Sequence, residues 1–243
     1  DSANAFYNEQ EQLLGFHTFI NKTGEQHSTA QSADIVTHEA AHAILDGLRD
    51  LYNESFGLGA RAFHESFGDM SAILVALHDD SLIRRLLDWS DGDLKMSNFI
   101  SEVAEHITDE LLQTQHFENH SIYLRNAFNM LENTPFDQLA YTPDNPEIEL
   151  ARQEHNYSRL FTGAFYDILV GIYERFVENN QHAFVALYRA RDVLGNLLTM
   201  AIEAGPVGEL NFSDMAKSFI TADEILYNGK YNAILRNVFN KRV

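Results

Sequence analysis

The chain has 243 residues, 45% of them hydrophobic, which is enough to bury the core of one large domain or two small ones. Its 36 acidic residues outnumber its 17 basic ones, and the formal net charge of -19 argues against nucleic acid and anionic membranes as partners. No cysteine is present, so any zinc site must use histidine and carboxylate ligands.

The sequence gives no sign of a membrane anchor. No apolar run approaches the roughly 20 residues that a membrane-spanning helix needs, and no signal segment opens the chain. Because the first residue is Asp1 rather than Met, we expect a chain that was processed or shortened, so that an upstream signal could have been lost. We expect a secreted or extracellular protein, with a cytoplasmic location as the alternative.

The first predicted elements are strands. Residues 5–8 and 13–20 combine aromatic and branched side chains with Gly15, a composition typical of extended chain or a hairpin. No later segment is as good a strand candidate, so we expect β structure only near the N-terminus.

A helix is predicted from about Ser32 to Gly47. His38 and His42 lie four residues apart in the sequence His-Glu-Ala-Ala-His, so on a helix they share one face about 5–6 Å apart, a gap that one zinc ion can bridge. Glu39 is too displaced to be a ligand but is near enough to act as general base on a water molecule at the metal. The alternative is an amphipathic helix that carries two histidines by chance.

A second helix is predicted over residues 61–78. A catalytic zinc ion needs a third protein ligand, and Glu65 is the best candidate. Asp69, one turn on, could accept the outer N–H of a ligand histidine. The alternative is a solvated acidic face, but neighbours such as Phe67 indicate a buried helix. His64 points to a different face, as a packing or supporting residue.

The middle of the chain is predicted to be mixed. A turn-rich loop spans residues 88–93, helical spacing continues through 97–131, and the proline-rich stretch 134–149 is a loop. His116 and His120 could clamp another metal ion, but no glutamate follows the first of them. We therefore favour the end of a surface helix for that pair.

The remaining chain is predicted to be helical at about 158–178, 181–203, 213–226 and 228–240. The predicted fold class is mainly α with a small N-terminal β edge, an α+β arrangement. We expect a single catalytic domain over residues 1–243. Its parts are the zinc-binding part at 1–80, an irregular and helical connection at 81–150 and a helical C-terminal part at 151–243.

These motifs give the chain a resemblance to a known family. His38-Glu39-Ala40-Ala41-His42, followed on a second helix by Glu65 and Asp69, resembles the pattern of the thermolysin-like zinc peptidases of the gluzincin class. The resemblance implies a thermolysin-like catalytic domain, in which a zinc helix and a second ligand helix precede a C-terminal helical bundle. Asn4 and Ala5 resemble the family's edge strand, whose backbone pairs with an extended substrate.

Other site residues come from the resemblance alone. Leu124 and Arg125 resemble a pair in which the leucine lines a hydrophobic pocket and the arginine binds a substrate carbonyl. His155 resembles the histidine that stabilises the oxyanion, whereas the residues alone also allow a surface histidine near a helix capped by Ser158. Tyr52 is the nearest candidate for a tyrosine that donates to the same oxyanion.

The chain departs from the family pattern in several places. Leu150 stands where the family has an aspartate that orients the histidine, so Glu149 or Asp144 would have to take that role. The stretch at Ala76 lacks the acidic cluster that binds paired calcium ions, so calcium dependence is left open. The β-rich half that precedes Asn4 in the family is absent, which leaves room for an upstream β-rich domain or pro-segment in a longer protein.

The sequence thus predicts a zinc-dependent endopeptidase with one zinc ion and a polypeptide substrate. In this hypothesis zinc and Glu39 activate water, Arg125 holds the substrate, and His155 and Tyr52 stabilise the oxyanion. The alternatives are a zinc-binding scaffold or interaction domain with impaired catalysis, and a hydrolase of a non-peptide amide. Glu39 favours an enzyme, because a structural zinc site has no use for a base.

Overall fold

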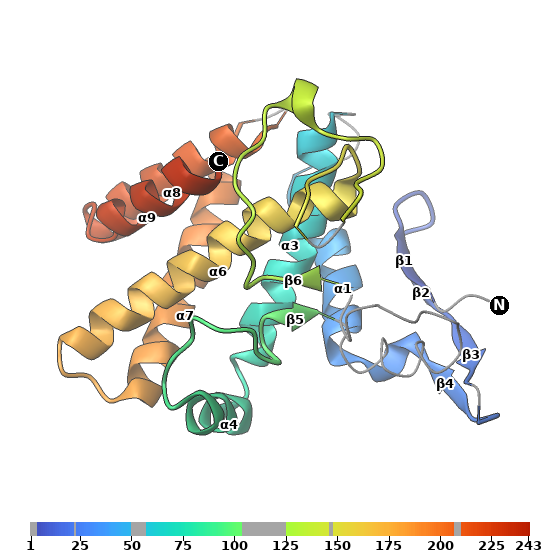
Figure 1. Cartoon of the computed structure of the whole chain (residues 1–243), viewed down its shortest axis with the longest axis horizontal. Helices are drawn as coiled ribbons and strands as arrows, with labels where there is room; N and C mark the ends of the chain where they lie inside the picture. Colours follow the sequence, from blue (N-terminus) through green and yellow to red (C-terminus); the bar gives the residue numbers. More distant parts are fainter. Residues whose placement is uncertain (1–3, 22, 50–56, 104–124, 146–147, 207–209) are drawn as a thin grey trace.

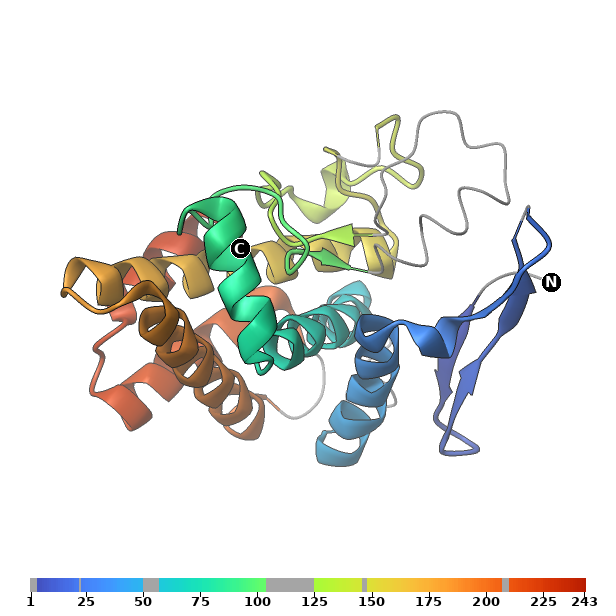
Figure 2. The same cartoon turned by 90° about the horizontal axis from the view of Figure 1, so that it is seen from below.

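The computed structural model describes residues 4–21, 23–49, 57–103, 125–145, 148–206 and 210–243. Within these ranges the chain is mostly helical, with small antiparallel strand pairs. The strands nearest the N-terminus stand at one end of the molecule, and the C-terminus lies in the helical body (Figures 1 and 2). The prediction of a mainly α fold with a β edge at the N-terminus is confirmed at this level.

The N-terminal segment forms two hairpins that lie beside the first helix. Their strands pair as β1 with β2 and β3 with β4. Phe19 from β3 is buried in a small apolar cluster with Ile35 and Val103, separate from the main core. This cluster fixes the strands to the start of the first helix. The strand bounds are β1 (Ala5–Asn8), β2 (Leu13–Phe16), β3 (Thr18–Ile20) and β4 (Gln26–Ser28).

Two helices that pack against each other carry the predicted metal ligands. They are α1 (Ala33–Leu48) and α3 (Leu58–Ala76), and α3 is buried along most of its length. Ser32 occupies the N-cap position of α1, but its hydroxyl bonds the carboxylate of Asp34 instead of the helix backbone. Gly47, which was expected to end α1, lies within it.

The helix after α3 was missing from the sequence-based prediction. It is α4 (Asp80–Ser90), and the carboxylate of Asp79 caps it by accepting from the backbone N–H of Ser81 at 2.7 Å. Its last turn covers residues that were predicted as a loop. Asp79 and Asp80 therefore mark the start of this helix, where acidic groups are favourable.

The prediction of helix over residues 97–131 is wrong at both described ends of that range. β5 (Glu102–Val103) pairs with β6 (Arg125–Asn126) as a third antiparallel pair. Upstream of β5, the side chain of Asn98 accepts from the backbone N–H of Ser101 at 3.1 Å. Such local side-chain bonds compete with helix formation, so a turn forms instead.

Four further helices complete the molecule around one hydrophobic core, to which α1, α3 and α4 also contribute. The first of them begins earlier than predicted, because Gln153 rather than Ser158 caps it. Ser158 lies inside that helix and donates to the carbonyl of His155 at 2.8 Å. The helix bounds are α6 (Glu154–Glu178), α7 (Ala183–Glu203), α8 (Phe212–Tyr227) and α9 (Asn232–Arg242).

The connection before α6 is mainly irregular where the structure describes it. Apart from one turn of 3-10 helix at Phe136–Gln138, residues 127–145 and 148–153 contain no helix. This agrees with the loop predicted over 134–149. None of the described helices combines the length and the apolar character that crossing a bilayer demands.

Candidate metal centre

The packing of α1 against α3 brings three potential metal ligands together. His38 and His42 lie one turn apart on α1, and Glu65 faces them from α3. One donor atom from each residue lies within 4.8 Å of the other two. These are the three ligands that the sequence predicted, and the group can hold a metal ion.

The spacing of the donor atoms suits tetrahedral coordination. Nε2 of His38 lies 3.1 Å from Nε2 of His42 and 3.3 Å from Oε2 of Glu65, whose Oε1 lies 3.7 Å from Nε2 of His42. A tetrahedral ion with bonds of about 2.0–2.2 Å separates its ligand atoms by about 3.3–3.6 Å. Oε2 of Glu65 is buried and accepts no hydrogen bond from the described residues. A cation would satisfy that oxygen, so the residues fit a metal ion.

Gly68 allows α3 to approach α1 at this point. A β-carbon added to Gly68 would lie 2.4 Å from Nδ1 of His38 and 2.5 Å from its Cε1, which is closer than non-bonded atoms can come. The imidazole of His38 therefore fills the space that a side chain at position 68 would need. The sequence-based prediction missed this residue, although a glycine in the middle of a buried helix is a signal of close packing.

Asp69 supports His38 from behind and also binds Arg125. Oδ1 of Asp69 lies 3.0 Å from Nδ1 of His38, and the carboxylate accepts from Nε and Nη2 of Arg125 at 2.8 Å each. Burial raises the pKa of Asp69, but Arg125 and His38 together outweigh burial and hold that pKa below its ordinary value. An ionised Asp69 favours a proton on Nδ1 of His38, which leaves Nε2 to face the metal position.

His64 stands behind the other histidine. Its Nδ1 lies 3.1 Å from Nδ1 of His42, and the two rings are stacked with centroids 5.3 Å apart. When His42 binds a metal ion through Nε2, its proton is on Nδ1, and Nδ1 of His64 is then the acceptor. Of the two predicted roles for His64, this contact favours support of the ligand.

The two ligand histidines have opposite electrostatic environments. Burial lowers the pKa of His38, but Asp69 and Glu65 outweigh burial and raise that pKa to about 9. Burial and the charge of His38 lower the pKa of His42 to about 3. Burial raises the pKa of Glu65, yet the histidines and Arg125 hold it well below its usual range. At neutral pH, therefore, His42 and Glu65 are ready to bind a metal ion, whereas His38 must first lose a proton.

Glu39 follows His38 on α1 and is partly buried. Burial raises its pKa, and the charge of Glu65 raises it further. His38, Arg125 and the backbone of Tyr7 act in the opposite direction, but the pKa stays above its ordinary value. A carboxylate with a raised pKa takes up a proton more readily, as a general base in this position needs.

His155, in the first turn of α6, reaches the same group. Its Nε2 lies 3.4 Å from Oε2 of Glu65, and its side chain is 52% exposed. We expect Glu149 or Asp144 to orient His155, but within the described part of the chain neither carboxylate contacts its imidazole. Glu149 instead accepts from the backbone N–H of Asp144, and Gln153 lies 2.5 Å from Nδ1 of His155. Gln153 gives no signal in the sequence, because a neutral glutamine does not stand out as the partner of a histidine.

The predicted substrate-binding residues are only partly described. Asn4 and Ala5 lie at the start of β1, where the carbonyl of Asn4 accepts from the backbone N–H of His17 at 3.0 Å. The hydroxyl of Tyr7 donates to Asp46 at 2.7 Å, which ties β1 to α1. Four residues singled out in the sequence lie outside the described ranges: Tyr52, His116, His120 and Leu124.

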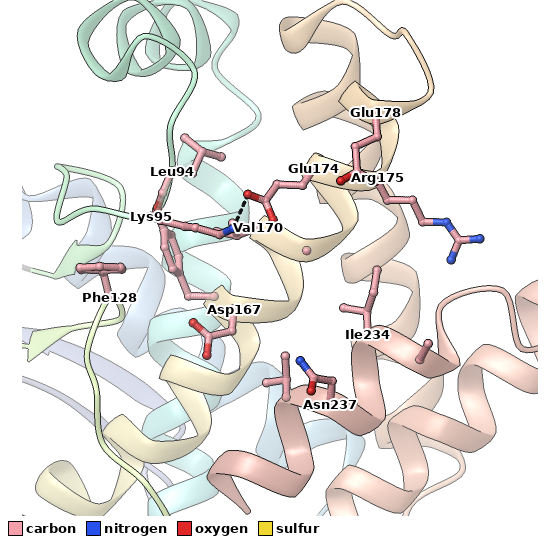
Figure 3. Close-up of a pocket in the computed structure, with 14 residues that line it drawn as sticks. Leu94, Lys95, Phe128, Asp167, Val170, Glu174, Arg175, Glu178, Ile234 and Asn237 are labelled. Carbon is pink, nitrogen blue, oxygen red and sulfur yellow. Dashed lines mark hydrogen bonds and ion pairs between the residues drawn. The ribbon is translucent and has the colours of Figure 1, made fainter.

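A hollow of about 630 Å³ lies between α6 and α9 (Figure 3). Val170 and Ile234 give it apolar walls, and Lys95 and Glu174 form an ion pair of 2.5 Å beside it. Its lining includes none of the metal-ligand group, so it is a separate feature of the surface. Among the described residues, no second group of histidines and carboxylates meets the spacing required for a metal ion.

Two comparisons with known proteins do not identify a family for this chain. A scan against protein-family models finds no match, and a search of curated proteins finds no relative. The function of the protein is therefore inferred from the side chains and distances of the site itself.

Proposed function

We propose that the protein is a zinc-dependent endopeptidase. The observation that carries the proposal is the group of His38, His42 and Glu65, with His155 in contact with Glu65. Glu39 follows His38 on α1, and its pKa is influenced by the charges of His38 and Glu65. Two imidazole nitrogens and one carboxylate are a donor set that zinc favours, and three protein ligands leave a fourth position open for chemistry. A site that only stabilised the fold would be closed by a fourth protein ligand.

Each polar group has a distinct part in the proposed reaction. Zinc bound there would supply a Lewis acid that polarises a carbonyl group and makes bound water more acidic. Glu39 accepts a proton from the attacking water and passes it to the leaving amine nitrogen. His155 donates from Nε2 to the carbonyl oxygen as negative charge develops on it.

Arg125 is suited to hold the substrate, although Asp69 already binds it. Within the described residues, the hydrogen bonds to Asp69 engage Nε and Nη2 of Arg125. Nη1 is the group through which the guanidinium could bind a substrate carbonyl. The pairing also fixes the planar group in one orientation, so less conformational entropy is lost when a substrate binds.

The position of β1 indicates which class of substrate the site would bind. It belongs to a two-stranded sheet in which β2 covers one of its edges. The other edge can accept backbone hydrogen bonds from an extended peptide, a common mode of peptide recognition. Because β1 is tied to α1 through Tyr7 and Asp46, a peptide on that edge would lie near the zinc ligands. This favours a polypeptide over a small amide as the substrate.

Cleavage of an unstructured protein, followed by mass spectrometry, tests the proposal. We expect zinc-loaded wild type to cleave it and the chelated protein to be inactive. Glu39→Gln should keep its zinc but lose roughly 10²–10⁴-fold in rate, because the variant loses the base and no ligand. Glu178→Gln, an exposed change at the end of α6, is the matched control and should behave as wild type.

Two outcomes would count against this function. A wild type that holds zinc and leaves every peptide intact would favour the scaffold alternative. Wild-type turnover by Glu39→Gln would show that this carboxylate has no part in catalysis.

A further inference from the structure

The side chain of Gln153 joins the start of α6 to His155. Its Oε1 accepts from the backbone N–H of Asn156 at 2.8 Å, which caps the helix. Its Nε2 lies 2.5 Å from Nδ1 of His155. One amide group thus serves two neighbours, one on the helix backbone and one on the imidazole.

The cap determines which way the amide of Gln153 faces. The backbone N–H of Asn156 can only donate, so the atom of Gln153 that faces it must be the oxygen. The NH₂ group therefore faces His155, and an amide NH₂ can only donate. Nδ1 of His155 must then be the acceptor, a ring nitrogen that carries no proton. This assignment follows from the bonding partners and does not depend on telling amide nitrogen from oxygen directly.

The opposite side of the ring leads to the same assignment. Nε2 of His155 faces Oε2 of Glu65 at 3.4 Å, and an ionised carboxylate can only accept. No hydrogen bond joins these two atoms, but the negative charge of Glu65 favours a proton on Nε2 over a lone pair there. The unprotonated Nδ1, with its lone pair, suits the NH₂ donor of Gln153. The hydrogen bond from Gln153 and the charge of Glu65 therefore favour the same tautomer.

We propose that Gln153 is a positioning residue that holds His155 as its Nε2–H tautomer. The N–H donor is then directed toward the candidate metal site formed by His38, His42 and Glu65. The consequence for catalysis rests on the proposed peptidase function: a substrate carbonyl oxygen is the acceptor that Nε2–H would meet there. With its side chain half exposed, the ring is accessible to such a ligand. The neutral amide of Gln153 thereby orients His155, a role that was expected of a carboxylate.

Two substitutions separate this role from the helix cap. Gln153→Asn keeps a good capping group, but its side chain is one methylene shorter and cannot also reach the imidazole. Gln153→Glu keeps an oxygen for the cap and places a carboxylate oxygen, an acceptor, beside Nδ1. Circular dichroism and thermal melting should show that both variants fold with α6 intact.

The first readout is the tautomer of His155, measured by ¹⁵N NMR of the metal-free protein at mildly alkaline pH. The His155→Gln variant identifies the resonances. We expect Nε2–H in wild type, Nδ1–H in Gln153→Glu and a mixture of the two in Gln153→Asn. A helix cap with no further role would leave the tautomer unchanged in all three proteins.

The second readout is kinetic and uses the zinc-loaded enzyme. In Gln153→Asn we expect kcat to fall about 10-fold with KM nearly unchanged, as is typical for loss of an outer partner of a site residue. This is less than the 10²–10³-fold loss typical when an oxyanion donor itself is removed, because the imidazole is still present.

The outcomes distinguish this inference from the proposed function. Nδ1–H in wild type, or an unchanged tautomer in Gln153→Glu, would overturn the role of Gln153. If the three proteins show the expected tautomers but wild type cleaves no peptide, the role of Gln153 is supported and the peptidase function is overturned.

Discussion

His38 is the residue at which proton binding and metal binding compete. Its Nδ1 faces Asp69 at 3.0 Å and its Nε2 faces Glu65 at 3.3 Å, so two carboxylates favour the charged imidazolium in the metal-free protein. These neighbours raise the pKa of His38 to about 9, against the opposing effect of burial. At neutral pH a metal ion must therefore displace a proton from Nε2 before it can bind there.

The pH dependence of zinc binding follows from this competition. Below a pKa of about 9 the proton on His38 opposes zinc, so affinity should rise about tenfold per pH unit between about pH 6 and 8 and level off near pH 9. His42, with a pKa of about 3, adds no competing proton in that range. Calorimetric titration in buffers of different ionisation enthalpy should show release of about one proton per zinc. Zinc binding without proton release would contradict this account of His38.

The grouping of His38, His42 and Glu65 could be predicted from the sequence because the spacing of these residues along each helix is a local feature. Two histidines four residues apart share a helix face, and the same spacing relates Glu65 to Asp69. The partners of these residues could not be predicted in the same way. Arg125 reaches Asp69 from 56 residues away, and Gln153 acts through a neutral amide that no charge pattern reveals.

At the scale of elements, the contact between α1 and α3 determines whether the ligands meet. At Gly68 the ring of His38 occupies the space that a β-carbon would need. Gly195 in α7 offers a contrast, because a β-carbon there would meet only Leu74 Cδ1, at an ordinary 3.8 Å. Two glycines in helices therefore have opposite expected responses to the same substitution.

Gly68→Ala should destabilise the metal-free protein by about 1–3 kcal/mol, because the added methyl group overpacks the helix contact. It should also weaken zinc binding, since the ring of His38 must move. Gly195→Ala is the matched control and should stabilise by up to about 1 kcal/mol through higher helix propensity. Denaturant unfolding and zinc titration measure both effects. Equal stability of the two variants would show that the helices are not in close contact at Gly68.

Most helices could be predicted because their apolar residues recur with helical spacing, and α1, α3 and α6 to α9 all bury such stripes. The failures have local causes. α4 begins at a capping Asp79 that was not recognised, and Asn98 bonds the backbone near Ser101 where a helix was predicted. The β5–β6 pair could not be foreseen, because its two strands lie far apart in the sequence.

At the scale of the whole molecule, Arg242 ties the C-terminal helix to the rest of the fold. Its guanidinium is buried and donates to Asp167 of α6 at 2.7 Å and to the carbonyl of Leu131 at 2.9 Å. It also binds the side chain of Asn129 at 2.8 Å. Leu131 and Asn129 follow β6, the strand that carries Arg125, which binds Asp69 beside His38. The last helix thereby helps to hold the segment after that strand.

Arg242→Met should destabilise the protein by roughly 3 kcal/mol, because a buried charge is lost while its carboxylate and carbonyl partners are left behind. Arg236→Ala, an exposed change on the same helix, should alter stability by less than about 0.5 kcal/mol. Thermal and denaturant unfolding provide the comparison. Similar losses in both variants would show that burial of Arg242 does not anchor α9.

The zinc content of the dialysed protein tests the central claim most directly. We predict one zinc per chain in wild type and in the exposed control His78→Ala, and loss of that zinc in His42→Ala, which removes one of three ligands but not the fold. Wild type without stoichiometric zinc after zinc loading, or His42→Ala with undiminished zinc, would contradict the assignment of His38, His42 and Glu65 as the metal ligands.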